Sequence, residues 1–452
     1  MIQDQNIKQL PKGWKWVKVG EYVISVKGKK PKRISKEKTK ECSIPYVNIK
    51  AFEKEVIDEY TDGVGCALCE DGDFLMVWDG SRSGYVGKAI KGALGSTLVK
   101  LNFPDMHNNY AYYFLQSKYL DINTRAKGVG IPHVDPNILW NYDLLIPPKP
   151  TQQAIVSKIE ELFSELDKGI EQLKTAQQQL KTYRQAVLKW AFEGKLTEQW
   201  RNEKQNSIKG EEFVKQLSVE KEKQQKLKKI KSKPIPSIED EELSKLPKLP
   251  GEFSWVRLGD LLWSVKDGPH YSPKYQAIGI PFISGGNIRP TGIDFSGSKF
   301  ISEELHNALS QRCKPEKGDV LYTKGGTTGI ARVNTYDIEF NVWVHVAVLK
   351  TLKSVNPFYL EHVLNSTHCY KQSQKYTHGV GNQDLGLTRM ILITLPVCSF
   401  EEQAVIVEAI ESRLSVADKM KESITESLQQ AEALRQSILK KAFEGKLINQ
   451  LK

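Results

Sequence analysis

Short apolar runs separated by turn residues fill two long stretches of the chain, Pro11–Pro150 and Gly251–Ser399. Runs such as Phe74–Trp78 and Val320–Thr323 are rich in β-branched and aromatic residues and are followed by glycine-containing turns. This pattern is typical of short strands joined by turns. We therefore predict that each stretch forms a mixed, mostly β globule with a few helices.

A second pattern follows each globule, with apolar positions spaced alternately three and four residues apart. These positions are Ile159, Leu162, Leu166, Leu173, Ala176, Leu180, Tyr183 and Val187 in the first stretch, and Ile410, Ala417, Met420, Ile424, Ala431, Leu434 and Ile438 in the second. Sustained heptads predict two long helices that pack as a coiled coil. Gly169, Arg413 and Ser427 interrupt the seam. The alternative is an amphipathic helix lying on its own globule, which does not need so long a stripe.

The chain also repeats itself. The run AFEGKL occurs at Ala191–Leu196 and again at Ala442–Leu447, and an offset of about 251 residues aligns Gln152–Val156 with Gln403–Val407. The globules match upstream as well, since Trp16–Gly20 corresponds to Trp255–Gly259. A duplication explains these matches, and an undetected repeat would lead to the wrong fold.

We predict an α+β fold with an internal pseudo-two-fold repeat, in which two mixed, mostly β globules are separated by two long antiparallel coiled-coil helices. The predicted parts are a first globule at 1–150, a first helix at 151–201, a basic connector or linker at 202–248, a second globule at 249–400 and a second helix at 401–452. The connector changes character because seven lysines fall within Lys221–Lys233, just before a proline-containing run.

The chain has 452 residues, a net charge of +11 and a pI near 9.0. Such a charge suits a polyanionic partner such as nucleic acid, although lysine-rich proteins without one are common. No run of eighteen apolar residues and no signal-peptide pattern occurs, so we expect a cytoplasmic protein with no membrane contact. Cys66 and Cys69 form a C-x-x-C, but no second ligand pair accompanies it, so we expect idle thiols rather than a metal site.

Catalytic motifs are missing from the sequence. No Asn-Pro-Pro-Tyr/Phe run for amino-methyl transfer occurs, and Gly84–Lys88 lacks the spacing of a phosphate loop. The eight histidines form no H-E-x-x-H or comparable cluster. We therefore predict no catalytic residue, no metal ligand and no cofactor, and a cryptic nuclease or methyltransferase is disfavoured.

Taken in order, the motifs resemble those of the specificity (S) subunit of Type I restriction–modification systems. The motifs are Leu-Pro followed by Trp-Val-x-Val/Leu-Gly at the start of each half, Asp267–Pro273 with Ile280–Ile283, the Gly-Asp strand, the Gln-x-x-Ile-Val helix start and the AFEGKL ending. They span nearly the whole chain. The halves depart from each other locally, since Pro132-His133 is replaced by Asn382-Gln383 and Pro148–Pro150 by Val397–Ser399.

The resemblance implies that each globule is a target recognition domain that reads one half of a split, asymmetric double-stranded DNA site. It also implies that the helices form an antiparallel spacer that binds two methyltransferase (M) subunits, with restriction/translocase (R) subunits in the same complex. A helix from Gln152 to Leu188 is about 55 Å long at ~1.5 Å per residue. That length is ample to hold two readers on successive major-groove faces, which lie about 34–36 Å apart.

The candidate DNA-binding residues lie on basic or glycine-rich loops at matching places in the two globules. In the first globule they are Lys27, Lys29, Lys30, Lys32, Arg33, Ser81, Arg82, Lys127 and His133, and in the second Lys266, His270, Tyr271, Lys274, Lys324, Thr327, Thr328, Asn382 and Gln383. Lysine and arginine neutralise phosphates, while arginine, asparagine and glutamine have the paired groups that read bases. The same loops could instead be hairpin turns with no partner.

One alternative of a different class remains. The chain could be a non-catalytic scaffold whose duplicated globules bind proteins through the coiled coil. A scaffold does not need basic loops at equivalent positions in both globules, or interiors that diverge between well-matched borders. Salt-dependent binding to duplex DNA would separate the two hypotheses.

Overall fold

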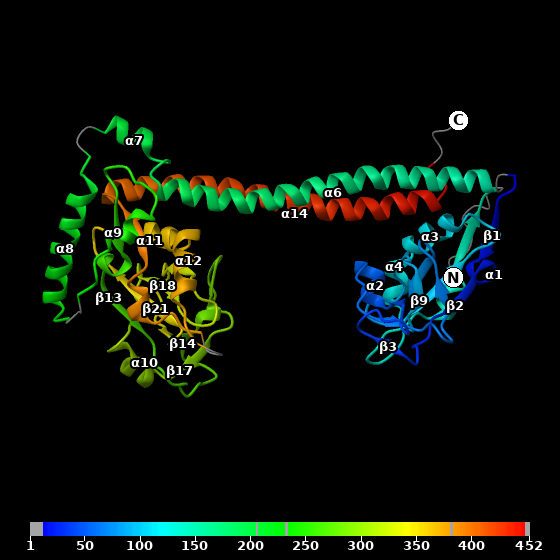
Figure 1. Cartoon of the computed structure of the whole chain (residues 1–452), viewed down its shortest axis with the longest axis horizontal. Coiled ribbons are helices and arrows are strands. Elements are labelled where there is room, and N and C mark those ends of the chain that lie inside the picture. The colour runs from blue at the N-terminus through cyan, green and yellow to red at the C-terminus, as the bar shows by residue number, and fades with distance from the viewer. Residues whose placement is uncertain (1–11, 205–206, 231–233, 380–382, 448–452) are drawn as a thin grey trace. The chain divides into compact units, whose positions relative to one another are not determined.

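The computed structural model describes residues 12–204, 207–230, 234–379 and 383–447. Its contacts divide the chain into two compact units (Figure 1). The first unit joins Met1–Thr175 to Ile424–Lys452, and the second is Ala176–Ser423. Each unit therefore contains one globule and a segment of each of two long helices.

The first globule is built on small sheets. A four-stranded sheet has the order β2-β10-β7-β8, a five-stranded sheet β3-β5-β4-β9-β6, and β1 pairs with β11. The strands are β1 (Lys15–Lys18), β2 (Ile24–Lys27), β3 (Ile34–Ser35), β4 (Ile44–Val47), β5 (Tyr60–Thr61), β6 (Leu68–Cys69), β7 (Phe74–Val77), β8 (Val86–Lys88), β9 (Gly92–Leu94), β10 (Leu98–Asn102) and β11 (Asp143–Ile146). The helices are α1 (Val19–Tyr22), α2 (Ile49–Lys54), α3 (Asn108–Ser117), α4 (Tyr119–Thr124) and α5 (Pro136–Leu139).

The second globule has a four-stranded sheet in the order β13-β21-β18-β19, a three-stranded sheet β17-β14-β20, and the pairs β12-β22 and β15-β16. The strands are β12 (Ser254–Arg257), β13 (Leu262–Asp267), β14 (Ile280–Ile283), β15 (Ile288–Arg289), β16 (Gly292–Ile293), β17 (Lys299–Ile301), β18 (Val320–Thr323), β19 (Ala331–Val333), β20 (Asn341–Val342), β21 (Val346–Thr351) and β22 (Thr394–Val397). Its helices are η1 (Leu258–Leu261), η2 (Gly285–Asn287), α10 (Glu303–Ser310), α11 (Pro357–Leu364), α12 (Thr367–Tyr376) and α13 (Leu387–Met390).

The four-stranded sheets of the two globules share one register. Lys27 lies opposite Val99, which lies opposite Met76 in the next strand. Asp267 lies opposite Ala347, which lies opposite Tyr322. The mixed α+β architecture expected from the sequence is therefore present, and Lys27 and Asp267 occupy equivalent positions.

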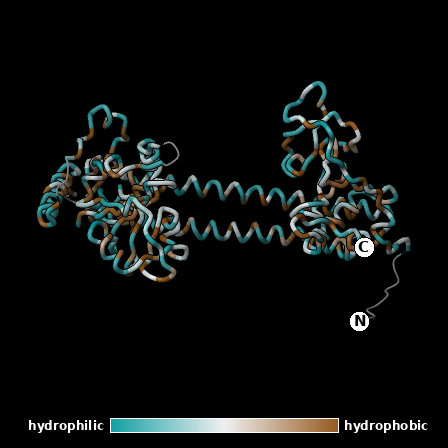
Figure 2. Tube along the Cα trace, turned by 90° about the horizontal axis from the view of Figure 1, so that it is seen from below, coloured by the Kyte–Doolittle hydropathy of each residue, from teal (hydrophilic) through white to brown (hydrophobic). Residues whose placement is uncertain are grey.

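Two 44-residue helices, α6 (Lys149–Phe192) and α14 (Phe400–Phe443), follow the globules in the chain. In the first unit the start of α6 lies beside the end of α14, and in the second unit the end of α6 lies beside the start of α14 (Figure 1). The helices thus run in opposite directions within each unit. Figure 2 shows that their middle stretches are mainly hydrophilic, as expected of surfaces that a globule does not cover.

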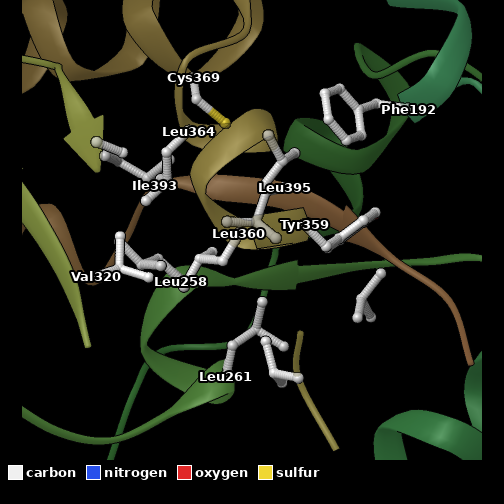
Figure 3. Close-up of a cluster of buried hydrophobic side chains, with 14 of the residues drawn as sticks. Phe192, Leu258, Leu261, Val320, Tyr359, Leu360, Leu364, Cys369, Ile393 and Leu395 are labelled. Carbon is white, nitrogen blue, oxygen red and sulfur yellow. The ribbon is translucent and has the colours of Figure 1, made fainter. Parts of the chain in front are cut away.

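The ends of both helices are buried in the cores of the globules. In the second unit Phe192, from the end of α6, meets the Tyr359 ring at 5.6 Å between centroids (Figure 3). In the first unit Phe443, from the end of α14, meets Tyr110 at 5.2 Å. Each AFEGKL copy therefore closes the core of the globule encoded by the other half of the sequence.

The start of each long helix is fixed by a buried glutamine. The Gln152 side chain accepts a hydrogen bond from the His107 backbone N–H at 2.8 Å and donates to the Pro147 carbonyl at 2.8 Å. Gln403 repeats both bonds, with the Asn356 N–H and the Cys398 carbonyl. Buried polar groups need such partners, which explains why glutamine opens both helices.

Some seam positions predicted from the heptads are wrong. Tyr183, Met420 and Leu434 are 37%, 52% and 50% exposed. Residues next to two of these positions form ion pairs between the two helices. Arg184 pairs with Asp418, and Arg435 pairs with Asp167. The Arg435 guanidinium also lies 4.4 Å from the centre of the Phe163 ring, so its long side chain fills space that the heptad pattern assigns to an apolar residue.

The connector takes the helical form of the two forms, helical or loose, that its sequence allows. After α7 (Glu198–Glu203), which ends at its start, it contains α8 (Gly210–Leu227) and α9 (Asp240–Ser244). Phe213 and Leu217 of α8 are buried in the core of the second globule. The stretch that follows is held by Glu242, whose carboxylate lies 2.7 Å from the Arg257 guanidinium. The predicted connector at 202–248 therefore belongs to the second unit.

We predict that Phe192→Ala destabilises the second unit by about 3 kcal/mol, because the substitution leaves a cavity where a buried ring packed. Amide hydrogen exchange should rise throughout Ala176–Ser423 and remain unchanged in the first globule. Phe400→Ala is the matched control, since the Phe400 ring is 45% exposed. Equal effects of the two substitutions would contradict the assigned packing.

Candidate nucleic-acid interface

Three loops of the first globule meet at one end of its four-stranded sheet. The loop after β2 is joined to the turn after β7 by an ion pair between Lys27 Nζ and Asp79 Oδ2 at 2.9 Å. That turn is joined to the hairpin at 127–133 by an isolated bridge between Asp79 and His133. The Gly80 N–H also donates to the Pro132 carbonyl at 2.8 Å. The three candidate segments of this globule thus form one surface, named here loop cluster 1.

The second globule gathers the equivalent loops in the same way. Lys324, directly after β18, places Nζ 2.7 Å from Asp384 Oδ1 and 3.5 Å from Asp267 Oδ2. Asp267 ends β13, and Asp384 closes a hairpin through two backbone hydrogen bonds to His378. Gly325 forms an isolated bridge with Asp384. This surface is loop cluster 2.

A dense set of cations marks loop cluster 1. Lys29, Lys30 and Lys32 are exposed, and no carboxylate of the described residues lies within ion-pair distance of them. Arg33 makes only long contacts, 3.8 Å to Glu41 and 4.0 Å to Asp62. Cations without fixed partners can neutralise phosphates at little cost in broken contacts.

A tight glycine fixes where the basic loop leaves the sheet. A Cβ on Gly28 would lie 2.1 Å from the Gly95 carbonyl oxygen, so only glycine allows this approach. Gly268 is equivalent, since its Cβ would lie 1.8 Å from the Val342 carbonyl oxygen. The two loops therefore leave their sheets at equivalent positions, each fixed by the close approach of another backbone segment.

Arg82 is less available than the sequence suggests. Its guanidinium lies 3.0 Å from Glu53 and 3.9 Å from the centre of the Tyr85 ring. Burial lowers the pKa of Arg82, but the hydrogen bond that Arg82 donates to the Tyr119 hydroxyl and the Glu53 charge outweigh it and raise the pKa overall. The neighbouring Ser81 is exposed, and its carbonyl accepts from Asn123 at 3.0 Å.

The hairpin at 127–133 closes through two backbone hydrogen bonds between Lys127 and His133, at 2.9 and 2.6 Å. Lys127 Nζ lies 2.7 Å from Asp135, and this hydrogen bond lowers the pKa of Asp135 below its ordinary value. His133 is half-buried. The tip of the hairpin is apolar and fully exposed at Val129.

In loop cluster 2, Lys266, His270, Tyr271 and Lys274 are exposed. The Tyr271 carbonyl accepts from the Trp343 indole at 3.2 Å, which fixes the loop backbone and leaves the ring outside. Next to this loop lies a cavity of about 420 Å³, lined by Asp267, His270, Tyr271, Arg312 and Asn341 among others. Arg312 forms a 2.8 Å ion pair with Asp267 at its wall.

The remaining candidates of the second globule separate by exposure. Thr327 and Gln383 are exposed. Lys324 and Thr328 are buried, with 2% and 6% of their surfaces accessible, so neither side chain can meet a ligand at the surface. Asn382 lies outside the described residues.

Sequence reasoning missed the acidic partners that tie these loops together. Asp79, Asp267 and Asp384 each join two loops, yet an isolated aspartate beside a glycine gives no signal of such a role. The one available clue was the alignment of Lys27-Gly28 with Asp267-Gly268. In this alignment Lys27 of the first globule matches Asp267 of the second, so the charge at this position of the sheet is opposite in the two globules.

The two cysteines of the C-x-x-C lie where their protonated thiols are favoured. Burial raises the pKa of the Cys69 thiol to about 11 and raises the pKa of Cys66 as well. No cluster of three or more histidine, cysteine, aspartate or glutamate side chains with metal-site geometry occurs among the residues described. Within the same ranges, no helix is both long and apolar enough to cross a bilayer.

Two globules with matching sheets, loop clusters at equivalent places and one strongly basic loop are features that suit a protein with a polyanionic partner. The comparisons identify the family. Residues 11–175 and 250–430 match the Type I restriction modification DNA specificity domain. The chain belongs to this family. Its members are the non-catalytic specificity subunits of restriction–modification systems, and their activity is the recognition of DNA.

Named relatives match along most of their length. The chain is 22% identical to the Type I restriction enzyme MjaVIII specificity subunit of Methanocaldococcus jannaschii, over 98% of this chain and 96% of the relative. It is 26% identical to the EcoBI specificity subunit of Escherichia coli, over 84% of this chain and 74% of the relative.

Solved structures share the fold. A chain from a structure titled for complex assembly and conformational transition of the type I R-M system matches with a TM-score of 0.65 and 19% identity, covering 97% of this chain and 99% of that one. The HsdS subunit from Thermoanaerobacter tengcongensis matches with a TM-score of 0.51 and 18% identity, covering 98% and 99%.

We predict that replacing Lys29, Lys30 and Lys32 together by alanine weakens binding to duplex DNA. The slope of log K against log salt should fall by about 1 for each lysine that contacts a phosphate. Titrations at several salt concentrations measure this slope. The control replaces Lys168, Lys174 and Lys181 by alanine. These lysines are exposed on α6, so their replacement removes the same charge. Equal slopes for the two triple variants would exclude the basic loop as a DNA contact.

Proposed function

We propose that this chain reads a split, asymmetric double-stranded DNA sequence, with one half read by each globule, and directs methyltransferase and restriction/translocase subunits to it. The observation that carries the proposal is the convergence of three loops at the same end of the same sheet in each globule. The two surfaces have the same construction and are formed by different segments of the chain. They are therefore suited to bind two parts of the same kind of ligand.

The side chains on the two loop clusters differ, which supports two different half-sites. Loop cluster 1 presents exposed lysines such as Lys29 and Lys30, whereas loop cluster 2 presents His270 and Tyr271 at the equivalent loop. Different patterns of donors and apolar groups meet different base edges in the major groove. The recognised sequence should therefore not be a palindrome.

The long helices are the proposed spacer and assembly surface. Their ends are buried in the globules, while their middle stretches carry exposed polar residues that no globule covers (Figure 2). Two equivalent helix segments offer two equivalent docking places, so we propose two methyltransferase subunits for each chain. The solved structure titled for complex assembly of the type I R-M system, which shares this fold, supports such partners.

In this proposal the target recognition domains are 1–150 and 249–400, and the spacer segments are 151–201 and 401–452, in which α6 ends at Phe192 and α14 ends at Phe443. The connector at 202–248 joins the two halves. A scaffold that binds only proteins is less well supported, because exposed lysines that have no carboxylate partner among the described residues gather on one loop of the first globule. That arrangement favours a polyanion over a neutral protein surface.

Exchanging Pro11–Pro150 for the matching segment of a relative should change one half-site and leave the other, together with the gap, untouched. Each globule has its own core, so the exchanged segment can fold on the retained helix ends. Mapping of methylated sites in cells that carry the hybrid measures the outcome. A simultaneous change in both half-sites would show that the globules are not independent readers.

The double substitution Leu173→Asp and Ile424→Asp tests the helix pair. Both side chains are half-buried on facing helices, and unpaired charges there should destabilise the pairing by on the order of several kcal/mol. We expect loss of methyltransferase subunits on co-purification. The control, Gln172→Asp with Gln430→Asp, adds the same charge at exposed helix positions. Normal assembly of the Leu173 and Ile424 variant would refute the assigned seam.

A further inference from the structure

The ion pair that joins the first two loops has opposite polarity in the two globules. In loop cluster 1 the cation, Lys27, ends β2 and the anion, Asp79, follows β7. In loop cluster 2 the anion, Asp267, ends β13 and the cation, Lys324, follows β18. The shared sheet register makes Lys27 and Asp267 equivalent, whereas Lys324 matches Trp78 and lies one position before the equivalent of Asp79.

Burial also differs between the two pairs. The side chains of Lys27 and Asp79 are 50% and 27% exposed, whereas those of Lys324 and Asp267 are 2% and 3% exposed. An exposed pair is screened by water and salt and holds its loops weakly. A buried pair is different, because removing one partner changes the charge balance in a site that water does not reach. Without Lys324, the buried Asp267 would keep the more exposed Arg312 at 2.8 Å and His270 at 3.5 Å as neighbours, and it would lose the one that joins it to the second loop.

Lys324 is also connected to all three loops of its cluster. Its Nζ contacts Asp267 of the first loop and Asp384 of the hairpin, and the residue itself begins the second loop. Its backbone carbonyl accepts from the Leu385 N–H at 2.8 Å, and its N–H donates to the His345 carbonyl at 2.9 Å. Because the side chain is buried, Lys324 can fix these loops but cannot reach a phosphate.

We infer that Lys324 is a positioning residue that sets the geometry of loop cluster 2, so that recognition of the second half-site depends on a buried ion pair that the first half-site lacks. This inference rests on the proposed function, since it assigns a role within DNA reading. Lys324 acts through the exposed groups around it, such as His270, Tyr271 and Gln383.

The experiment uses the full chain and a duplex that it selects from a random-sequence pool. Discrimination is the affinity ratio between this duplex and one with a single base pair changed in either half. Lys324→Met should lower discrimination in the second half by about tenfold, the order of one lost base contact, and leave the first half unchanged. The salt slope should not change, because Lys324 makes no phosphate contact.

Lys350→Met is the matched control. Lys350 lies on β21 of the same sheet, is 15% exposed, and forms 2.7 Å ion pairs with Glu316 and Asp319. In the strand register, Lys350 lies away from the end of the sheet that carries the loops. Loss of the Lys350 ion pairs should therefore lower the stability of the globule without lowering discrimination between duplexes. Equal losses of discrimination in both variants would mean general destabilisation and would overturn the inference.

The Asp384→Asn variant provides a second test in case the Lys324→Met variant does not fold. Asp384 is 40% exposed, so its neutralisation leaves Lys324 paired with Asp267 and the globule intact. We expect a several-fold loss of discrimination in the second half at an unchanged unfolding temperature. Full discrimination in this variant would overturn the inference and leave the proposed function standing. A wild-type chain that selects no sequence would overturn both.

Discussion

The burial of each helix end in the opposite globule is the contact on which the structure depends. Phe192 packs on Tyr359 and Phe443 packs on Tyr110, so neither core is complete without the helix that begins at the other globule. Aromatic burial of this kind is among the larger contributions a single side chain makes. It ties the two halves reciprocally, and it requires the same helix ending to be present twice.

Each long helix is also attached to the globule that precedes it in the sequence. In each globule a buried glutamine, Gln152 or Gln403, joins the start of the long helix to the segment before it. The start of each long helix is therefore fixed to its own globule by buried hydrogen bonds. These bonds involve none of the loop-cluster residues, so the loop residues can change without disturbing the start of the helix.

The sequence predicted the larger elements well because they follow periodic patterns. The heptads, the repeated borders and the short apolar runs all correspond to elements of the structure. It failed where long polar side chains replace apolar ones, as Arg184 and Arg435 do in the helix pair. It also failed for Lys324, since a lysine beside two glycines indicates an exposed turn, and burial through Asp267 and Asp384 depends on distant residues. Pairing across loops leaves no local signal.

The central claim is that two similar but separate surfaces read two parts of one DNA sequence. Selection of duplexes from a random pool by the full chain, with its methyltransferase subunits, tests this claim most directly. The account predicts two short conserved blocks of different sequence, separated by a gap of constant length. One continuous block, two identical inverted blocks, or blocks separated by a variable gap would contradict it.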